Sequence, residues 1–500
     1  MICAISRGFF LASLAERMAT VDAQARAEKG DFGRGTIPEG ERKINLEYIS
    51  ANPTGPLHVG HGRWAALGDA TARVMRHAGY DVFEEFYIND AGTQMDNFGE
   101  SVAVRYQQLL GRDVEMPEAC YAGSYVKDIA QTIIDEDGDK WLDADPKERM
   151  ENFRERAYAY ELAEQHRVTE RFGTTFGCWF SERSLYVPDE DGLSAVDRSL
   201  KAMDEKGYIY VEDGATWFRS SAFDDEKDRV LIKANGEMTY FMSDVAYHYN
   251  KMERGFDHLI NIWGADHHGY IGRMMAMCEA FGDKPGENMQ ILIGQLVNVM
   301  KDGKAVRMSK RAGNVVTIDD LTDAIGVDAS RYSLARTDYN SPVDIDLNLL
   351  SSHSNENPVY YVQYAHARSC NVDRNAAAAG ITYEGADVSL LDTTADGEVL
   401  AALAQWPALL REAGDLRAPH RVAHYLEDLA ATYHKWYNVE RVVPMELTDP
   451  EARGEQADAI RIAKAPEPAR AAARLKLNDA VKTVIAEGLD LLGVTAPDKM

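Results

Sequence analysis

The sequence contains little cysteine. Five cysteines are scattered through 500 residues, and no two of them form a CxxC pair. A disulfide framework normally uses an even set of cysteines, and a cysteine zinc site uses closely spaced pairs, so neither is indicated. We therefore expect reduced thiols, a cytoplasmic protein and no zinc.

Long apolar runs are also absent. No stretch approaches the 18 continuous apolar residues of a membrane-spanning helix, so no membrane partner is predicted. The short apolar stretch Gly8–Ala15 runs directly into Glu16 and Arg17 and is not followed by secretory features. A signal peptide is therefore not expected.

Positive charge is in deficit. Lys and Arg number 54 against 81 Asp and Glu, which gives a net charge of −27. Such acidity usually argues against a nucleic-acid partner, because phosphate contacts need cations. Net charge describes the whole surface, however, and a local basic area can still bind RNA. With 500 residues and 45% hydrophobic content, a globular protein of roughly three domains is expected.

One motif begins at the end of a predicted strand. The segment Glu47–Arg63 reads EYISANPTGPLHVGHGR: a β-like run, a turn rich in Pro and Gly, and a helical pattern starting near His58. The N-terminus of such a helix attracts phosphate through its dipole and its unpaired backbone N–H groups. His58 and His61 can donate to phosphate oxygens, and Gly60 between them lets a flat purine approach the backbone.

A second motif lies far along the chain. The segment Val306–Asn314 reads VRMSKRAGN and follows a predicted hairpin with its turn at Asp302-Gly303. Lys310, with Arg307 and Arg311 nearby, could neutralise a leaving pyrophosphate. Together the two motifs resemble the HIGH-like and KMSKS-like signatures of class I aminoacyl-tRNA synthetases. That resemblance implies one ATP site in a Rossmann domain, lined by His58, Gly60, His61, His267, Met308, Ser309 and Lys310.

The order of strand and helix patterns suggests three regions. Residues 1–40 contain a predicted helix, Leu11–Lys29, and a Gly-rich connector. Residues 41–350 are predicted to form an α/β Rossmann-like domain with a parallel sheet, which includes a strand at TYFMSD and a helix-rich insertion at about 91–230. Residues 351–500 are predicted to be an all-α bundle, with helices at Leu390–Leu416, Val422–Val442 and Glu467–Leu492.

The flanking segments narrow the resemblance. ANPTGPLHVGH, WGADHHGYI, NPVYYVQYAHAR and GLDLLGVTAP are similar to segments of the arginyl-tRNA synthetase family, in the same order. A guanidinium needs carboxylates near the ATP. The resemblance implies that Glu47, Asn52, Tyr240 and Asp244 bind arginine, although Asp244 could instead cap the following helix.

Two groups of residues keep alternative interpretations. Asp266, His267 and His268 are possible metal ligands, but no fourth ligand stands at a suitable spacing. In the helical region, aromatic side chains could stack on unpaired bases or simply form the core. The resemblance places anticodon contacts in this region. It implies a tRNA-binding set of Tyr433, Trp436, Tyr437 and Met500, with a second aromatic group at Tyr360, Tyr361, Tyr364 and Arg368.

The implied activity is ATP-dependent charging of tRNA(Arg) with L-arginine, through an arginyl-adenylate and with Mg²⁺-bound ATP. We expect a monomer. The chain departs from the family pattern at Arg307 and Arg311, and it enters the family's N-terminal tRNA-binding module near its end, so we expect that module to be truncated. The rival interpretations are a small-molecule nucleotidyltransferase or adenylate-forming ligase, another class I synthetase, and a non-catalytic RNA-binding paralogue.

Overall fold

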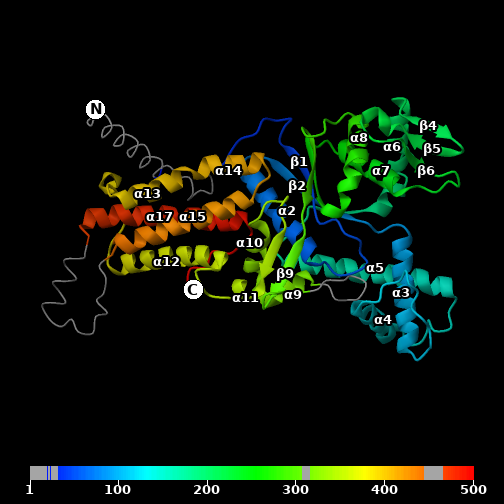
Figure 1. The fold of residues 1–500 in the computed structure, drawn as a ribbon, viewed down its shortest axis with the longest axis horizontal. Helices are drawn as coiled ribbons and strands as arrows, with labels where there is room; N and C mark the ends of the chain where they lie inside the picture. The colour runs from blue at the N-terminus through cyan, green and yellow to red at the C-terminus, as the bar shows by residue number, and fades with distance from the viewer. Residues whose placement is uncertain (1–19, 21–22, 24–31, 307–315, 444–465) are drawn as a thin grey trace.

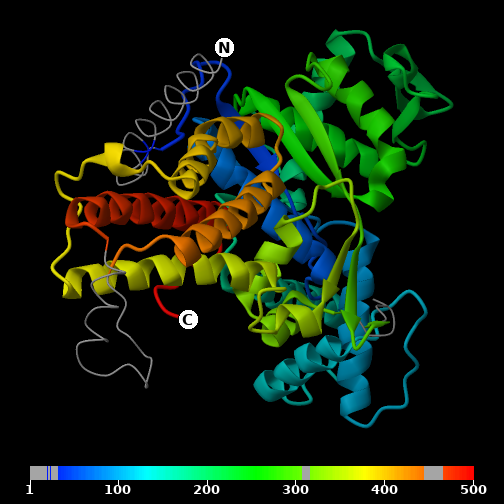
Figure 2. The same ribbon diagram turned by 60° about the vertical axis from the view of Figure 1, so that its left-hand side comes forward.

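The computed structural model describes residues 20, 23, 32–306, 316–443 and 466–500. An elongated helical bundle lies at one end of the molecule, a parallel sheet in the middle and two lobes at the other end (Figures 1 and 2). Almost all of the predicted helix Leu11–Lys29 falls outside the described residues, and so do Arg307, Met308, Ser309, Lys310 and Arg311 of the second motif.

The central sheet contains five parallel strands in the order β3-β2-β1-β7-β8. β1 (Lys43–Glu47) lies in the middle, β2 (Asp81–Ile88) and β3 (Cys178–Ser181) lie on one side, and β7 (His258–Gly264) and β8 (Met289–Gly294) lie on the other. The strand order reverses between β1 and β7, and open sheets of this kind bind ligands at the carboxyl ends of the strands beside that point. The predicted Rossmann-like sheet is confirmed.

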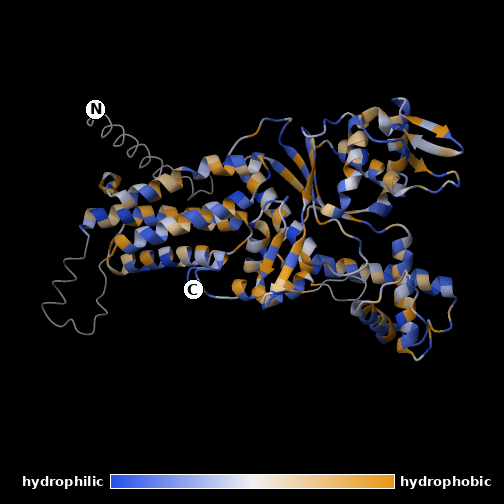
Figure 3. Ribbon diagram, in the orientation of Figure 1, coloured by the Kyte–Doolittle hydropathy of each residue, from blue (hydrophilic) through white to orange (hydrophobic). Residues whose placement is uncertain are grey.

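The helix that follows β1 packs closely on this sheet, whose strands are rich in apolar residues (Figure 3). It is α2 (Val59–His77). A Cβ atom on Gly68 of α2 would come within 2.4 Å of the Tyr48 ring, and one on Gly294 within 1.8 Å of the Trp64 ring. Both positions therefore need glycine. The close packing holds the first turn of α2 at the carboxyl end of β1.

Two excursions leave the sheet (Figure 1). The first joins β2 to β3 and contains α3 (Thr93–Leu109), α4 (Ser124–Asp137) and α5 (Pro146–Arg171). The second joins β3 to β7 and contains η1 (Glu182–Tyr186), α6 (Ala195–Glu205), β4 (Ile209–Glu212), β5 (Ala215–Phe218), η2 (Ser220–Phe223), β6 (Arg229–Ile232) and α7 (Tyr240–Glu253). β3, a strand of the central sheet, thus lies within the range 91–230 and separates the two lobes.

The prediction of a strand at TYFMSD is wrong. These residues open α7, and Thr239 occupies the N-cap position. Asp244 therefore lies inside the helix and is not its cap. Phe241, Met242 and Val245 are buried at helical spacing against the second lobe, so tertiary packing outweighs the β propensity of this aromatic-rich segment.

A hairpin follows the central sheet, as predicted. β9 (Val297–Lys301) and β10 (Lys304–Ala305) are antiparallel, and Asp302 and Gly303 between them both have positive φ, of 52° and 71°. This is the backbone of a tight two-residue turn. β9 also pairs in parallel with β11 (Val343–Asp346), so Val297–Lys301 belongs to a separate three-stranded sheet and not to the central one. The remaining elements here are η3 (Ala265–Tyr270), α8 (Ile271–Phe281), α9 (Ile318–Ile325), α10 (Val327–Ala335) and α11 (Leu347–Leu350).

The C-terminal region is helical, as predicted. It contains α12 (Pro358–Ala378), η4 (Val388–Leu390), α13 (Thr394–Ala404), α14 (Trp406–Asp415), α15 (His420–Val439) and α17 (Pro468–Leu491), and no strand occurs in its described part. The predicted single helix Leu390–Leu416 is interrupted, because Pro407 has no N–H to continue α13 and instead lies in the first turn of α14. Among the described helices, none combines the length and apolar character needed to cross a membrane.

A buried arginine joins the helical region to helix α2. The Arg331 guanidinium, on α10, forms an ion pair with Asp69 of α2 and donates to the Leu492 carbonyl at the end of α17. It also donates to the Phe172 carbonyl, 2.9 Å away, directly after α5. Four segments that are distant in sequence therefore meet at one side chain that is fully buried.

Candidate active site

The first turn of α2 is capped by the two motif histidines. His58 Nδ1 accepts from the backbone N–H of Gly60, 3.1 Å away, and from that of His61. In return, His61 Nδ1 accepts from the His58 backbone N–H at 3.1 Å, which completes a capping box. The two rings are stacked, with centroids 3.8 Å apart.

This capping corrects the expectation of unpaired backbone N–H groups at the start of α2, and it indicates which ring nitrogen of each histidine can donate. The N–H groups of Gly60 and His61 are engaged by the His58 ring, and that of Val59 donates to the Val316 carbonyl at 2.9 Å. These backbone groups are therefore not unpaired phosphate donors. Because Nδ1 of each ring accepts a hydrogen bond, the neutral imidazole carries its proton on Nε2. The cap therefore leaves Nε2–H as the ring donor through which each neutral histidine can bind an anion.

The residues that follow the second motif lie beside the first motif. Residues Val316 and Thr317 form a bridge with the start of α2: Ile318 N–H donates to the Leu57 carbonyl, and Thr317 pairs with His58. Met308, Ser309 and Lys310 lie outside the described residues, so their contacts stay predictions. The residues that follow them are nevertheless anchored next to the histidines.

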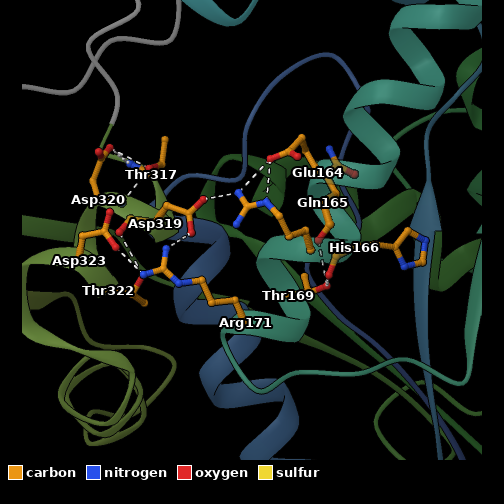
Figure 4. A network of polar contacts seen from close by, with 11 residues as sticks. Glu164, Gln165, His166, Thr169, Arg171, Thr317, Asp319, Asp320, Thr322 and Asp323 are labelled. Carbon is orange, nitrogen blue, oxygen red and sulfur yellow. Dashed lines mark hydrogen bonds and ion pairs between the residues drawn. The ribbon is translucent and has the colours of Figure 1, made fainter.

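An ion-pair network holds this anchor against the first lobe (Figure 4). Arg167 and Arg171, on the last turns of α5, both contact Asp319 of α9, with N–O distances of 2.6 Å and 2.5 Å. Arg171 also pairs with Asp323. Thr317 caps α9 through reciprocal hydrogen bonds with Asp320. The helix that follows the second motif is thereby fixed to both α2 and α5.

Glu47 lies at the carboxyl end of β1 and is buried. One carboxylate oxygen accepts from Lys251 Nζ at 2.6 Å, and the other accepts from the Ser50 hydroxyl at 2.8 Å. The Ser50 hydroxyl in turn accepts from the Tyr87 backbone N–H at 3.1 Å. The carboxylate is therefore held in one orientation.

Asp244 approaches the same region from α7. Its carboxylate accepts from the Tyr270 hydroxyl at 2.5 Å. Burial raises the pKa of Asp244 to about 7, and the negative charges of Glu182 and Glu47 add to the rise. The predicted pair Glu47 and Asp244 is therefore brought together, although the two residues are far apart in sequence.

Sequence reasoning missed a third carboxylate. Glu182, in η1 at the end of β3, is 4% exposed and accepts from the Tyr186 hydroxyl at 3.1 Å. Burial raises its pKa, and it forms no ion pair within the described residues. The pKa of Tyr87 is raised, mainly by burial and also by the negative charges of Glu182 and Asp244. The only sequence signal for Glu182 was its place directly after a short strand in SERSLY.

Tyr240 and Asn52 are the other two predicted arginine contacts. Tyr240 lies one helical turn before Asp244, and 63% of the residue is exposed, which is unusual for an aromatic ring. Asn52 lies in the turn between β1 and α2, and its amide donates to Gln94 at 2.9 Å. Both positions therefore suit the predicted contacts with a ligand.

The Asp266–His268 segment forms η3 at the end of β7. The His267 side chain is 58% exposed and lies 3.6 Å from the Asp266 carboxylate. His268 lines a cavity of about 350 Å³ that is bounded on its other sides by β8, the Asp338–Asn340 loop and Arg417. His267 and His268 therefore lie beside the switch point of the sheet but do not contact the three carboxylates.

Two predicted tRNA contacts lie in the bundle core. Tyr433 is fully buried and donates to Asn478 at 2.7 Å, and Trp436 is 1% exposed and donates to Asp396 at 2.8 Å. Base stacking needs an accessible ring face. The expectation for Tyr433 and Trp436 is therefore corrected: both residues hold α15 against α13 and α17.

The accessible aromatic groups lie on one face of α12 and the end of α15. The Arg368 guanidinium lies 4.6 Å from the Tyr364 ring and 4.6 Å from the Tyr437 ring, so it is placed between them. Tyr360 stacks on Tyr364, with an interplanar angle of 10°. We call Tyr360, Tyr364, Arg368 and Tyr437 the aromatic face. Its members are partly exposed, so a ring of this face can be reached by an unpaired base.

The C-terminal tail runs along α12. Gln363 donates to the Thr495 carbonyl at 2.9 Å, and a His366 ring nitrogen lies 3.0 Å from the Pro497 carbonyl oxygen. Met500 at its end is 52% exposed. Unlike Tyr433 and Trp436, Met500 is therefore accessible to a ligand.

Comparison with known proteins agrees with this arrangement. Residues 33–346 match the tRNA synthetases class I (R), catalytic domain, and residues 362–500 match the DALR anticodon binding domain. The chain is 66% identical to the arginine–tRNA ligase of Bifidobacterium adolescentis, over 97% of this chain and 83% of that protein. It is 49% identical to that of Kineococcus radiotolerans, over 99% and 84%.

A solved structure extends this likeness to the fold. The crystal structure of a Campylobacter jejuni protein assigned as an arginyl-tRNA synthetase matches with a TM-score of 0.83 and 34% identity, and the match covers 97% of this chain and 100% of that one. The chain belongs to the arginine–tRNA ligase family of class I aminoacyl-tRNA synthetases.

Proposed function

We propose that the residues at the carboxyl end of the central sheet carry out the two steps of its family's reaction, the ATP-dependent attachment of L-arginine to tRNA(Arg). The observation that supports this most directly is the meeting of Glu47, Glu182 and Asp244 beside the histidine-capped start of α2. The carboxylates suit a guanidinium, and the helix start suits a phosphate.

In the first step, the arginine carboxylate attacks the α-phosphorus of Mg²⁺-bound ATP in line. Arginyl-adenylate forms, and pyrophosphate leaves. Nε2–H of His58 and His61 stabilises the negative charge that develops on the phosphates, and Lys310 acts from the second motif. Positioning and electrostatic stabilisation are sufficient for this chemistry, so no covalent enzyme intermediate is needed.

The amino-acid side chain is recognised by charge. Asp244 and Glu47 accept from the guanidinium, Tyr240 packs on the substrate, and Asn52 lies near its α-amino group. Glu182 adds negative charge close to Asp244. An ammonium or a neutral urea group cannot satisfy the same set of acceptors, because a guanidinium offers five N–H donors in a planar fork.

In the second step, the 3′-terminal adenosine of the tRNA takes the arginyl group, and AMP is released. We place the catalytic domain at residues 41–350 and the anticodon-binding domain at 351–500. Tyr437 and Met500 contact the anticodon region. The enzyme acts as a monomer in the cytoplasm, which is consistent with the free thiols of the four described cysteines.

Aminoacylation tests the proposal directly. Purified protein is incubated with tRNA(Arg) and labelled arginine, with and without ATP, and lysine and citrulline serve as controls. We expect ATP-dependent charging with arginine alone. Binding of tRNA(Arg) without charging would instead support a non-catalytic RNA-binding protein, and adenylation without transfer to tRNA would support a small-molecule nucleotidyltransferase.

The affinity for arginine is expected to depend on pH. Because the pKa of Asp244 is raised to about 7, the free enzyme holds this carboxyl protonated below pH 7 and ionised above it. A cationic guanidinium needs the ionised form, so the arginine KM should rise about tenfold per pH unit below 7 and level off above 8. Steady-state aminoacylation at pH 5.5 to 8.5 measures it. The ATP KM is the internal control, and an arginine KM that does not change between pH 6 and 8 would contradict the assignment.

Loss of the Tyr437 ring is expected to weaken tRNA binding. One stacked base contributes about 1–3 kcal/mol, so Tyr437→Ala should raise the KM for tRNA(Arg) about 5- to 150-fold. The arginine and ATP KM values at saturating tRNA should not change. Tyr433→Phe is the matched control: it keeps the buried ring and removes only the hydrogen bond to Asn478. Equal tRNA KM values for both variants would argue against a stacking role of Tyr437.

A further inference from the structure

A row of polar side chains that includes Glu47 crosses the central sheet. Asn261 of β7, Glu47 of β1 and Glu85 of β2 are register partners on adjacent strands, so their side chains lie side by side on one face of the sheet. All three are buried. A row of two carboxylates in the interior requires cations, because an unpaired buried charge is costly.

Lys251 of α7 and Arg254, the C-cap residue of this helix, are the two cations. Lys251 Nζ donates to Glu47 at 2.6 Å and to the side-chain amide oxygen of Asn261 at 3.0 Å, and Arg254, one turn later, pairs with Glu85 through both terminal nitrogens. Lys251 lies seven residues after Asp244, which is two helical turns and therefore the same face of α7. Helix α7 thus carries Asp244, a proposed arginine-binding residue, and also Lys251, which pairs with Glu47, the second proposed arginine-binding carboxylate.

The contacts of Lys251 are those of a positioning group. Its side chain is 1% exposed, and its ammonium lies 4.5 Å from the centroid of the Tyr247 ring. The ammonium holds one Glu47 oxygen while Ser50 holds the other. Glu47 is therefore held in one orientation by these two groups, which leaves its remaining lone pairs as acceptors for a guanidinium.

We propose that Lys251 is a positioning residue of the arginine site: it sets the affinity for arginine by holding the Glu47 carboxylate in place, without touching the substrate. The inference rests on the proposed role of Glu47. It also explains why a pocket for a cationic substrate contains a buried lysine. Lys251 balances the charge of Glu47. Glu47 therefore favours arginine through the orientation of its hydrogen-bond acceptors, whereas Asp244 and Glu182 favour the cationic guanidinium through their negative charge.

The neighbouring Arg254–Glu85 pair is a matched control. It lies in the same row on the same helix and is similarly placed between α7 and the sheet, and Tyr247 donates to Glu85 at 2.5 Å. Glu85 is not assigned to the substrate. If the row of charges only stabilises the fold, loss of either cation should have the same consequences.

The test compares Lys251→Met, Lys251→Arg and Arg254→Met by aminoacylation kinetics and thermal unfolding. We expect Lys251→Met to raise the arginine KM about 10- to 100-fold while the ATP and tRNA KM values stay within twofold, as is common for groups that support a ligand-binding residue. Lys251→Arg should restore the arginine KM to within about threefold. Arg254→Met should lower the melting temperature and leave the arginine KM within about threefold.

Two further variants keep the inference falsifiable if Lys251→Met folds poorly. The double variant Glu47→Gln/Lys251→Met removes both charges, so it should recover the melting temperature but not the arginine KM. Glu47→Gln alone should also raise the arginine KM. An unchanged KM in Glu47→Gln would overturn the proposed role of Glu47 itself. A raised KM in Glu47→Gln, with Lys251→Met either unchanged or indistinguishable from Arg254→Met, would overturn only the positioning role of Lys251.

Discussion

His58→Asn is expected to lower the rate of arginyl-adenylate formation about 10²- to 10³-fold and to leave the protein's melting temperature almost unchanged. The asparagine carbonyl oxygen lies close to the position of Nδ1, so it can still accept from the Gly60 N–H, and asparagine is a favourable N-cap residue. It lacks the Nε2–H donor. Loss of one donor aimed at developing negative charge costs about 3–4 kcal/mol in activation free energy.

Pyrophosphate exchange, measured with arginine and tRNA(Arg) present, reports on this step. His58→Ala is the matched control, because it removes the cap together with the donor. We expect it to be as slow as His58→Asn and to be less stable by about 1 kcal/mol. If His58→Asn retained the wild-type rate, or if its rate loss appeared only with a loss of folded protein, the ring would serve as a cap and nothing more.

Asp244→Asn is expected to lower kcat/KM for arginine about 10²- to 10⁴-fold. The carboxylate would form a charge-assisted hydrogen bond with the guanidinium in a region from which water is largely excluded, and removing one member of such a pair costs about 3–5 kcal/mol. Tyr270 can still donate to the asparagine carbonyl oxygen, so the position of the side chain is retained. The ATP KM should therefore be unaffected.

Discrimination between arginine and citrulline gives the sharper readout. Citrulline has nearly the same shape but no charge, so the preference for arginine should shrink in Asp244→Asn and, to a smaller extent, in Glu182→Gln. Asp323→Asn, at a mostly exposed ion pair with Arg171, serves as the control. A variant Asp244→Asn with wild-type preference for arginine would show that the charge recognised lies elsewhere.

The sequence specified the elements whose signals are local. The turn after β1, the periodic apolar positions of α2 and the Asp302-Gly303 hairpin each depend on a few neighbouring residues, and all three were predicted close to where they occur. The strand predicted at TYFMSD was wrong because its aromatic and β-branched residues are equally suited to a buried helix face, and only the second lobe that packs on α7 decides between them.

The candidate site shows the same division. The first motif indicated His58 and His61, and the family resemblance implied Glu47 and Asp244. They could not show that the histidines cap α2 and take up the backbone N–H groups, since a hydrogen bond depends on ring orientation. Nor could they separate Tyr437, which is partly exposed, from Tyr433, which is buried, because both lie in one aromatic stretch of α15.

By itself, then, the sequence determined the fold class, the order of the regions, and the residues that stand in motifs. Only the tertiary structure decided which charged side chains are buried next to one another. Glu182 and Lys251 lie outside the motifs, and their importance comes from burial beside Asp244 and Glu47, which are far away in the chain. The interaction of charged groups depends on distance and on the exclusion of water, and both quantities arise only when the sheet and its two lobes pack together.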